Sequence, residues 1–362
     1  MSSFGQVIHI DLFGESHGEA IGLVIHNLPA GLQLDKERIS KALYKRRPKS
    51  KLSTARQEQD EYQIISGYFN DKTTGTPLTI IIPNTDTRSR DYSPEILRPS
   101  HSDYTAHIRY DGYHDYRGGG HFSGRLTAPL VILGAICESI LNDHEIQIGS
   151  HISSIKDVSD AEFSSIELNK EVLESLNSSD FPTIDNAVVN QYQQIILDAK
   201  ANQDSVGGTI ETAVIGVPAG YGTPFFEKVE SILSHLLFSI PAVKGLEFGD
   251  GFAMTRKLGS ETNDPFILEN GSIKTSSNHS GGLQGGITNG MPIVFRTAIK
   301  PTSSIGKPQQ TVNIDTMEAI TLELKGRHDP AIVHRVIHVI NAITSYAILE
   351  LIVRQEGPKW MI

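Results

Sequence analysis

The sequence contains one cysteine, Cys137, and no excess of positive charge. A lone cysteine cannot form an intramolecular disulfide, and the apolar residues around Cys137 predict a small buried side chain. The formal net charge is −10. We therefore expect no nucleic-acid partner, because nucleic-acid-binding domains usually carry a basic excess. Low cysteine usage fits a reducing compartment, so the protein is expected to be cytoplasmic.

The sequence also lacks a secretion signal and a long apolar run. The N-terminal segment MSSFGQVIHI has no basic region followed by an apolar one, so no signal peptide is expected. A membrane span needs about 18 or more apolar residues in a row. The apolar runs here are interrupted by Glu138, or by His334, Arg335, His338 and Asn341. We therefore expect no membrane association.

The composition is that of an ordinary soluble protein. Hydrophobic residues make up 38% and charged residues 20% of the 362 positions, which is enough apolar material for a sizeable core. Strand and helix patterns mix without strict alternation, and no repeat or linker is evident. The prediction is an α+β fold that forms a single domain over 1–362.

Residue patterns predict the main elements. Strands are expected at 6–13, 21–25, 62–68, 78–82, 205–215 and 292–298. Helices are expected at 36–46, 128–141, 225–238 and 330–353, with Asp35 as an N-cap and Pro330 at a first helical position. The last helix is apolar nearly all round and should be buried. Segment 148–200 is weakly periodic and polar, which predicts peripheral helices and no chemistry.

The stretch 98–127 is the most polar and most distinctive part of the chain. It holds four His, four Arg, four Tyr and three Asp, with three glycines at Gly118–Gly120. This composition excludes a core element and predicts a long ordered loop that enters a helix. Glycines followed by a helix start can hold an anion, since backbone N–H groups can approach the ligand. A glycine hinge packed against a neighbour explains the pattern equally well.

Two further clusters suit an anionic ligand. Between 41 and 56 lie seven basic residues and no acidic one: Lys41, Lys45, Arg46, Arg47, Lys49, Lys51 and Arg56. In a protein of negative net charge this local reversal indicates a site for phosphate or carboxylate groups, although a solvated basic surface is about as probable. The second cluster is Lys300 with the hydroxyls that follow it, which suits a phosphate group.

Three motif interpretations have little support. Gly14–Gly18 matches G-x-S-x-G, but a nucleophile elbow would need several strands before it and a helix after it. His334 and His338 stand four residues apart on a predicted helix, without a glutamate in the zincin position or an evident third ligand, so we expect no metal site. No P-loop or dinucleotide-binding glycine motif is present. The residues alone therefore indicate a protein that handles an anionic, phosphorylated ligand.

Taken together, the motifs resemble the chorismate synthase family over nearly the whole chain. The matching pieces follow one another in the family order: FGESHG (13–18), RRP (46–48), TARQEQD (54–60), SGYF (66–69), TTGTP (73–77), RPSHSDYT (98–105), DYRGGG (115–120), SIPAVKGLEFGDGF (239–252), SNHSGGLQGGI (277–287), KPTSSI (300–305) and GRHDP (326–330). One such match is weak, but eleven in order are highly specific.

The resemblance implies a fold, an activity and a cofactor. The fold would be a β-α-β sandwich, assembled as a homotetramer. The activity would be the last step of the shikimate pathway, in which 5-enolpyruvylshikimate-3-phosphate loses phosphate and a C6 proton by 1,4-anti elimination to give chorismate. Reduced FMN would be required without net redox change, with NADPH as an indirect reductant. No reductase segment is evident, so an external flavin reductase is expected.

The resemblance also assigns roles to residues. His17 of GESH would lie near the departing phosphate. His101 of RPSH would lie near N1 and the C2 carbonyl of the flavin and protonate it. Asp329 of RHDP would help N5 of the flavin accept the C6 proton. Imidazoles and carboxylates can exchange protons near neutral pH, so these roles are chemically reasonable.

Binding residues carry over in the same way. The expected flavin contacts are His121, Phe122, Ser123, Pro241, Ala242, Gly285, Lys300, Pro301, Thr302, Ser303, Ser304 and Arg327. The expected substrate or NADP contacts are Ser16, Arg46, Lys51 and Arg125.

The chain departs from the family text after the glycines. The usual RSSARET is HFSGRLT here, so that His121, Phe122 and Leu126 replace Arg, Ser and Glu. The loss of that arginine would change flavin binding at this position. Because Ser16, His17, Ser123 and other key residues are retained, an active but divergent member is predicted. A non-catalytic flavin- or phosphate-binding relative and a hydrolase that uses Ser16 are the alternatives.

Overall fold

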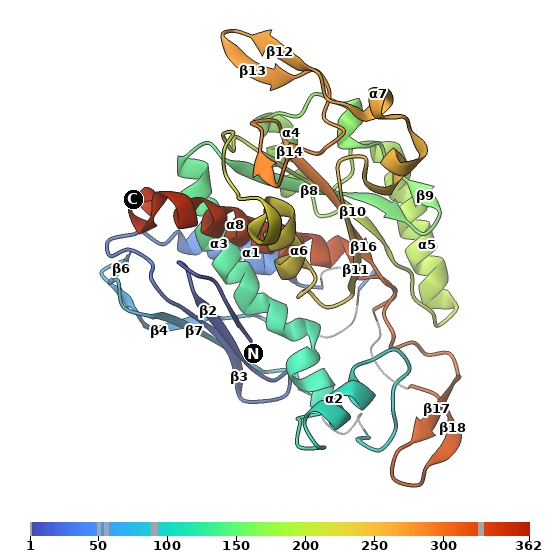
Figure 1. Cartoon of the computed structure of the whole chain (residues 1–362). Coiled ribbons are helices and arrows are strands. Elements are labelled where there is room, and N and C mark those ends of the chain that lie inside the picture. The colour runs from blue at the N-terminus through green and yellow to red at the C-terminus, as the bar shows by residue number, and fades with distance from the viewer. Residues whose placement is uncertain (1, 49–51, 54–57, 88–92, 325–328) are drawn as a thin grey trace.

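In the computed structural model, two five-stranded antiparallel sheets enclose a layer of helices (Figure 1). The structure describes residues 2–48, 52–53, 58–87, 93–324 and 329–362. The strand order is β1-β2-β3-β7-β4 in the first sheet and β11-β16-β10-β8-β9 in the second. The predicted α+β class is confirmed, with the β-α-β layering that the resemblance implied.

The strand bounds are as follows. The first sheet holds β1 (Ser3–Phe4), β2 (Ile10–Gly14), β3 (Ala20–Ile25), β7 (Leu78–Pro83) and β4 (Gln63–Ser66). The second holds β11 (Val243–Phe248), β16 (Ile293–Ile299), β10 (Gly208–Ile215), β8 (Gln147–Ile155) and β9 (Val158–Ser159). Small hairpins are formed by β5 (Tyr68–Phe69) with β6 (Lys72–Thr73), β12 (Phe266–Glu269) with β13 (Ser272–Thr275), β14 (Leu283–Gln284) with β15 (Ile287–Thr288), and β17 (Gln309–Asn313) with β18 (Glu318–Leu322).

The helices divide into a central layer and a peripheral set. The central layer holds α1 (Lys36–Arg46), α3 (Thr127–Asp143), α6 (Val229–Leu237) and α8 (Val333–Glu356). The peripheral helices are α2 (Asp103–Arg109), α4 (Lys170–Ser178), α5 (Val189–Ala201) and α7 (Gly259–Thr262). One hydrophobic core includes buried residues of both sheets and of the central helices.

The centre of the helical layer is the packing of α3 against α8. A side chain at Gly134 would put its Cβ 2.2 Å from the Cβ of Ala342, so the close approach of the two helices requires a glycine there. By length and composition both helices could cross a membrane. However, 83% and 89% of their apolar windows are buried inside the fold. Cys137 on α3 is fully buried, and so is most of α8, as predicted.

Most predicted elements are present. Asp35 caps α1, where its side chain accepts a hydrogen bond of 2.8 Å from the backbone N–H of Arg38. Two predictions are wrong. Pro330 precedes α8, which begins at Val333, so it does not occupy a first helical position. Segment 148–200 includes most of β8, a buried strand of the second sheet, as well as the peripheral helices α4 and α5.

The 98–127 stretch is more regular than a plain loop. It contains α2 and two 3₁₀ turns before α3 begins at Thr127. Tyr104, Ile108 and Tyr113 are exposed, so this segment lies on the surface rather than in the core, as its composition predicted.

Candidate active site

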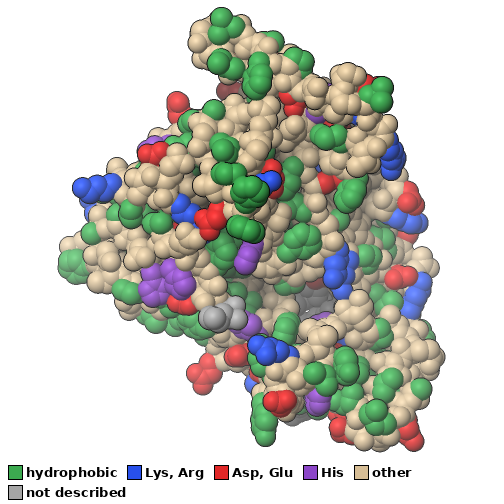
Figure 2. All heavy atoms as spheres, viewed as in Figure 1, with side chains coloured by type: hydrophobic (Ala, Val, Ile, Leu, Met, Phe, Trp, Pro, Cys, Tyr) green, Lys and Arg blue, Asp and Glu red, His purple; other side chains and the backbone are tan. Residues whose placement is uncertain are grey.

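A cavity of about 1400 Å³ lies where several connecting segments meet the helical layer. Its wall combines the turn after β2, the C-terminal end of α1, the 98–127 stretch, the segment from α6 to β11, residues 300–304, and the N-terminal half of α8. Figure 2 shows one face of the molecule hollowed, with Lys, Arg and His side chains at the rim of the hollow. A cavity of this size has room for more than one small ligand.

Most of the residues predicted from the sequence line this cavity. They are His17, Arg46, His101, His121, Phe122, Ser123, Arg125, Pro241, Ala242, Lys300, Pro301, Thr302, Ser303, Ser304 and Asp329. Ser16 is fully buried and lies behind the wall, and Gly285 stands in the β14–β15 turn, away from the lining. Lys51 and Arg327 lie outside the described residues.

The glycine run 118–120 packs against both His17 and His101. All three glycines have positive φ, at 63°, 84° and 53°, a conformation that other residues rarely adopt. A Cβ at Gly118 would lie 2.5 Å from the ring of His17, and one at Gly119 would lie 3.3 Å from Cε1 of His101. The predicted glycine loop therefore packs between the two imidazoles. Helix α3 starts seven residues beyond Gly120, so the glycines are not at its N-terminus.

His101 is held by a carboxylate and a guanidinium. Its Nδ1 lies 2.6 Å from Oδ1 of Asp103, and Arg98 contacts both oxygens of Asp103 through Nε at 2.8 Å and Nη2 at 2.7 Å. Burial alone would raise the pKa of Asp103, but the hydrogen bonds from His101 and Arg98 outweigh burial and hold that pKa well below its usual range. Asp103 is therefore ionised near neutral pH.

His121 serves a local structural purpose. Its Nδ1 lies 2.8 Å from the carbonyl oxygen of Gly14, and its Nε2 lies 2.6 Å from the hydroxyl of Ser2. The backbone N–H of Ser16 also donates to the carbonyl of Gly120 at 3.1 Å. These bonds tie the turn that carries His17 to the glycine run and to the N-terminal strand.

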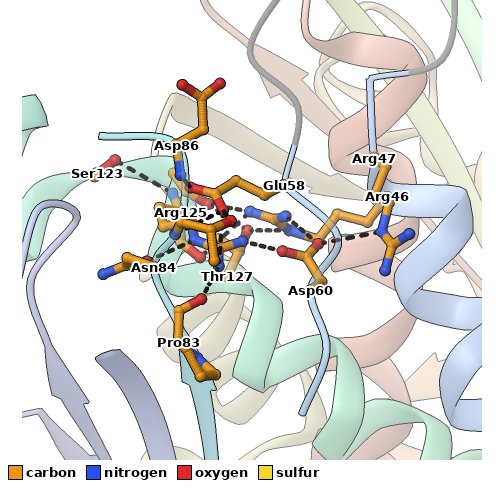
Figure 3. A network of polar contacts seen from close by, with 12 residues as sticks. Arg46, Arg47, Glu58, Asp60, Pro83, Asn84, Asp86, Ser123, Arg125 and Thr127 are labelled. Atoms are coloured by element: carbon orange, nitrogen blue, oxygen red, sulfur yellow. Dashed lines mark hydrogen bonds and ion pairs between the residues drawn. The ribbon is translucent and has the colours of Figure 1, made fainter. Parts of the chain in front are cut away.

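Arg46 and Arg125 meet around the buried carboxylate of Asp60 (Figure 3). Asp60 lies 3.4 Å from Nη1 of Arg46 and accepts a hydrogen bond from Nη1 of Arg125, while only 1% of its side chain is exposed. Arg46 also donates from Nε to Thr127 at 2.9 Å and from Nη2 to the Gly124 carbonyl at 2.7 Å. Both guanidinium groups are thus largely occupied by protein acceptors.

The residues of the predicted basic cluster therefore differ in their surroundings. Arg46 points inward, whereas the neighbouring Arg47 side chain is 26% exposed in the cavity wall. Nε of Arg47 is buried without a hydrogen-bond partner among the described residues, and its nearest carboxylate is Asp60 at 3.8 Å. Lys41 is exposed, and Lys45 donates to the carbonyl of Asn177. Lys49, Lys51 and Arg56 lie outside the described residues.

Asp329 is paired with a residue that sequence reasoning missed. Nη1 of Arg335, on the first turns of α8, donates to Oδ2 of Asp329 at 2.8 Å, and Nε of Arg335 donates to the Arg46 carbonyl at 3.2 Å. The Thr302 hydroxyl donates to the backbone carbonyl of Asp329 at 2.6 Å. One sequence signal for Arg335 was available, since it is a charged residue in the first turn of a mostly apolar helix.

Lys300 supplies positive charge beside the 98–127 stretch. Its Nζ donates to the carbonyl of Ser100 at 2.8 Å. Partial burial, and secondarily the nearby charge of Lys244, lower the pKa of Lys300. In the part of the chain that the structure describes, neither lysine forms an ion pair with a carboxylate. Their charge is available to an anionic ligand.

Comparison with known proteins agrees with this arrangement. A model of the chorismate synthase family matches residues 8–353. The chorismate synthase of Thermococcus gammatolerans is 42% identical over 357 residues, covering 98% of both chains. That of Chitinophaga pinensis is 43% identical over 358 residues, again covering 98% of both.

A solved structure gives the same result for the fold. A crystal structure of chorismate synthase superposes with a TM-score of 0.75 at 27% sequence identity, covering 98% of this chain and 94% of the other. The chain therefore belongs to the chorismate synthase family.

Proposed function

We propose that this protein converts 5-enolpyruvylshikimate-3-phosphate to chorismate in the cavity, with reduced FMN as cofactor. The carbon–oxygen bond to phosphate and the C6–H bond break, and a new carbon–carbon double bond forms. The observation that carries the proposal is the convergence of His17, His101 and Asp329 on one cavity with several cationic side chains. These are the residue types that a phosphate elimination with proton transfer needs.

The cavity suits a flavin in shape and chemistry. Pro241, Ala242, Ile332 and Val336 give it an apolar wall against which a ring system can pack. Residues 300–304 provide an ammonium group and hydroxyls for its phosphate. When bound, reduced FMN supplies the electron density that helps phosphate to leave and regains it by the end of the turnover.

The protein's own groups handle protons and charge. His17 is buried to 9% exposure and is placed to donate a proton to the departing phosphate. His101 lines the cavity and is placed to exchange a proton with a bound molecule through its ring. Asp329 is placed to assist removal of the proton from C6, and its ion pair with Arg335 fixes the direction of its carboxylate.

The anionic groups of the substrate need cations that are not already committed. Arg46 and Arg125 are occupied by Asp60 and neighbouring carbonyls, so they shape the wall and add positive potential. Arg47, Lys244 and Lys300 are the described cations best placed for direct contacts with substrate or flavin phosphate.

An anaerobic assay tests the proposal. Protein, chemically reduced FMN and 5-enolpyruvylshikimate-3-phosphate are mixed, and chorismate and free phosphate are followed together. We expect equal amounts of both products without net flavin oxidation. His17→Ala and His101→Ala should each lower kcat by about 10²- to 10⁴-fold, the usual contribution of a general acid or base.

Other outcomes would contradict the proposal. If FMN binds but neither product appears, the chain is a non-catalytic relative. If Ser16→Ala abolishes turnover while His101→Ala leaves it intact, a hydrolase mechanism applies. The full burial of Ser16 opposes that mechanism, because its hydroxyl is not presented to the cavity.

We further propose that NADPH acts only through a separate flavin reductase. NADPH and FMN should therefore fail to support aerobic turnover until a flavin reductase is added. Turnover without the reductase would show that the protein reduces its own flavin.

The remaining proposals concern assembly and location. A single domain is supported by one hydrophobic core that joins both sheets to the central helices. A homotetramer is supported by exposed apolar side chains on the projecting β12–β13 hairpin, where Phe266, Leu268 and Ile273 are 67%, 76% and 72% exposed (Figure 1). Sedimentation measurements would test the tetramer. A buried free cysteine is consistent with a cytoplasmic location.

A further inference from the structure

We propose that Asp103 is the positioning residue of His101, and that it fixes the proton on Nδ1 so that Nε2 faces the reacting molecules. The proposal rests on the proposed function for the role of His101, but the contacts among His101, Asp103 and Arg98 are observed in the structure itself. Arg98 completes the arrangement by holding both carboxylate oxygens of Asp103.

Three polar groups lie near Nδ1 of His101, and the longest contact, 3.4 Å to the Ser102 hydroxyl, is compatible with either tautomer because a hydroxyl can donate or accept. The tautomer therefore follows from the other two contacts. Oδ1 of Asp103 lies at 2.6 Å and requires a proton on Nδ1, whereas Nη2 of Arg98 lies at 3.1 Å and would require a lone pair there. The carboxylate contact is shorter and charge-assisted, and Nη2 already donates to Oδ1 of Asp103 at 2.7 Å. The carboxylate therefore decides the tautomer, and Nδ1 carries the proton.

The opposite edge of the ring is kept open for chemistry. A Cβ at Gly119 would lie 3.3 Å from Cε1 and 3.5 Å from Nε2 of His101, so any side chain there would crowd this edge. His101 also lines the cavity. With Nδ1 committed to Asp103, only Nε2 can exchange a proton with a bound ligand.

Arg98 explains why the carboxylate does not swing away. It binds Oδ2 through Nε and through its backbone N–H at 2.9 Å, and Oδ1 through Nη2. Such a fork holds a carboxylate in one plane. An asparagine at position 103 could not replace it, because its amide nitrogen would face N–H donors in either orientation.

The first test reads the tautomer without turnover. The full-length protein carrying ¹⁵N-labelled histidine is examined by long-range ¹H–¹⁵N NMR, and the His101 signals are identified as those lost in His101→Asn. We expect Nδ1 of His101 to be protonated in the parent protein. An unprotonated Nδ1 in the parent would overturn the proposal, whether or not the protein makes chorismate.

The second test uses Asp103→Asn and a matched control. In Asp103→Asn we expect the proton to move to Nε2, and kcat to fall about 10- to 1000-fold with a change in KM below about threefold. Asp115 forms the same two-point contact with Arg117, at 2.8 and 2.7 Å, but within the described part of the chain it forms no hydrogen bond with a histidine. Asp115→Asn should leave the His101 tautomer unchanged.

The outcomes separate positioning from stability. A kcat of Asp103→Asn within threefold of the parent, or a tautomer that does not change, would overturn the proposal. If Asp103→Asn does not fold, the tautomer measured in the parent protein still decides whether Asp103 positions His101. If the parent shows the expected tautomer but no substrate is converted, the proposed function fails while the role of Asp103 in orienting His101 stands.

Discussion

Replacing Asp60 by asparagine should destabilise the protein more than any surface change. Asp60 is 1% exposed and neutralises two guanidinium groups, those of Arg46 and Arg125, which are themselves 8% and 3% exposed. Asparagine removes the negative charge but keeps the size of the side chain. Both cations then remain buried with one charge fewer beside them, and removing one partner of a buried ion pair costs about 3–5 kcal/mol.

The expected change in melting temperature follows from the length of the chain. Unfolding entropy is about 2.1 cal/mol/K per residue, so 3–5 kcal/mol corresponds to about 4–7 °C for a chain of this size. Thermal scans at one heating rate, or urea unfolding, would measure it. The KM for 5-enolpyruvylshikimate-3-phosphate should change too, because Arg46 and Arg125 shape the cavity wall.

Asp204 provides the matched control for Asp60. It pairs with Lys307 at 2.7 Å, but the two side chains are 40% and 49% exposed. An exposed pair contributes about 0–1 kcal/mol, so Asp204→Asn should shift the melting temperature by about 1 °C or less. If Asp60→Asn melts within 1 °C of Asp204→Asn, the Asp60 network is not stabilising and the reasoning is wrong.

Two further predictions concern single residues. Burial, with the Arg335 charge adding to it, lowers the pKa of His334 to about 4, so the folded state keeps this ring neutral while the unfolded chain protonates it near pH 6.5. Stability should therefore be lost as pH falls from about 6.5 to 4, by about 2–3 kcal/mol at pH 4.5, and urea unfolding of His334→Gln should lack this part of the pH dependence. Gly118→Ala should displace His17, because its Cβ would lie 2.5 Å from that ring at a φ of 63°; kcat should fall about tenfold or more, whereas Gly259→Ala, with open space around its Cβ, should match the parent.

Local patterns in the sequence predicted the elements that depend on local physics. The N-cap at Asp35 and the buried character of α8 could be predicted because both depend only on residues that are close in sequence. The α+β class followed from the order of those elements. Pro330 misled the prediction because a proline suits the residues before a helix as well as its first turn.

Strand β8 was not predicted because several of its buried side chains are polar and are stabilised by hydrogen bonds. His151 is fully buried between Asp160 and Glu211, with both ring nitrogens 2.9 Å from a carboxylate oxygen. Ser150 lies 2.8 Å from the hydroxyl of Thr212 on β10. Partners from other elements satisfy these polar groups, so the strand is buried without the apolar pattern by which buried strands are recognised.

The same limit applies to the candidate site. His17, His101 and Asp329 were predicted from motifs. The roles of Asp60 and Arg335 were not predicted, because these two residues contact partners that lie far away in the sequence. Asp60 is 65 residues from Arg125 in sequence, and Arg335 joins Asp329 to the backbone of Arg46. Only the fold reveals that these charges are paired and that Arg47 is less committed than Arg46.

The departure at His121 can now be understood from its hydrogen bonds. The Nδ1 atom of His121 lies 2.8 Å from the carbonyl oxygen of Gly14, and its Nε2 lies 2.6 Å from the Ser2 hydroxyl. Both ring nitrogens are thus engaged within the protein, and His121 anchors the turn that carries His17. Positive charge for an anionic ligand is also available elsewhere in the cavity lining, from Arg47, Lys244 and Lys300, and neither lysine has a carboxylate partner among the described residues.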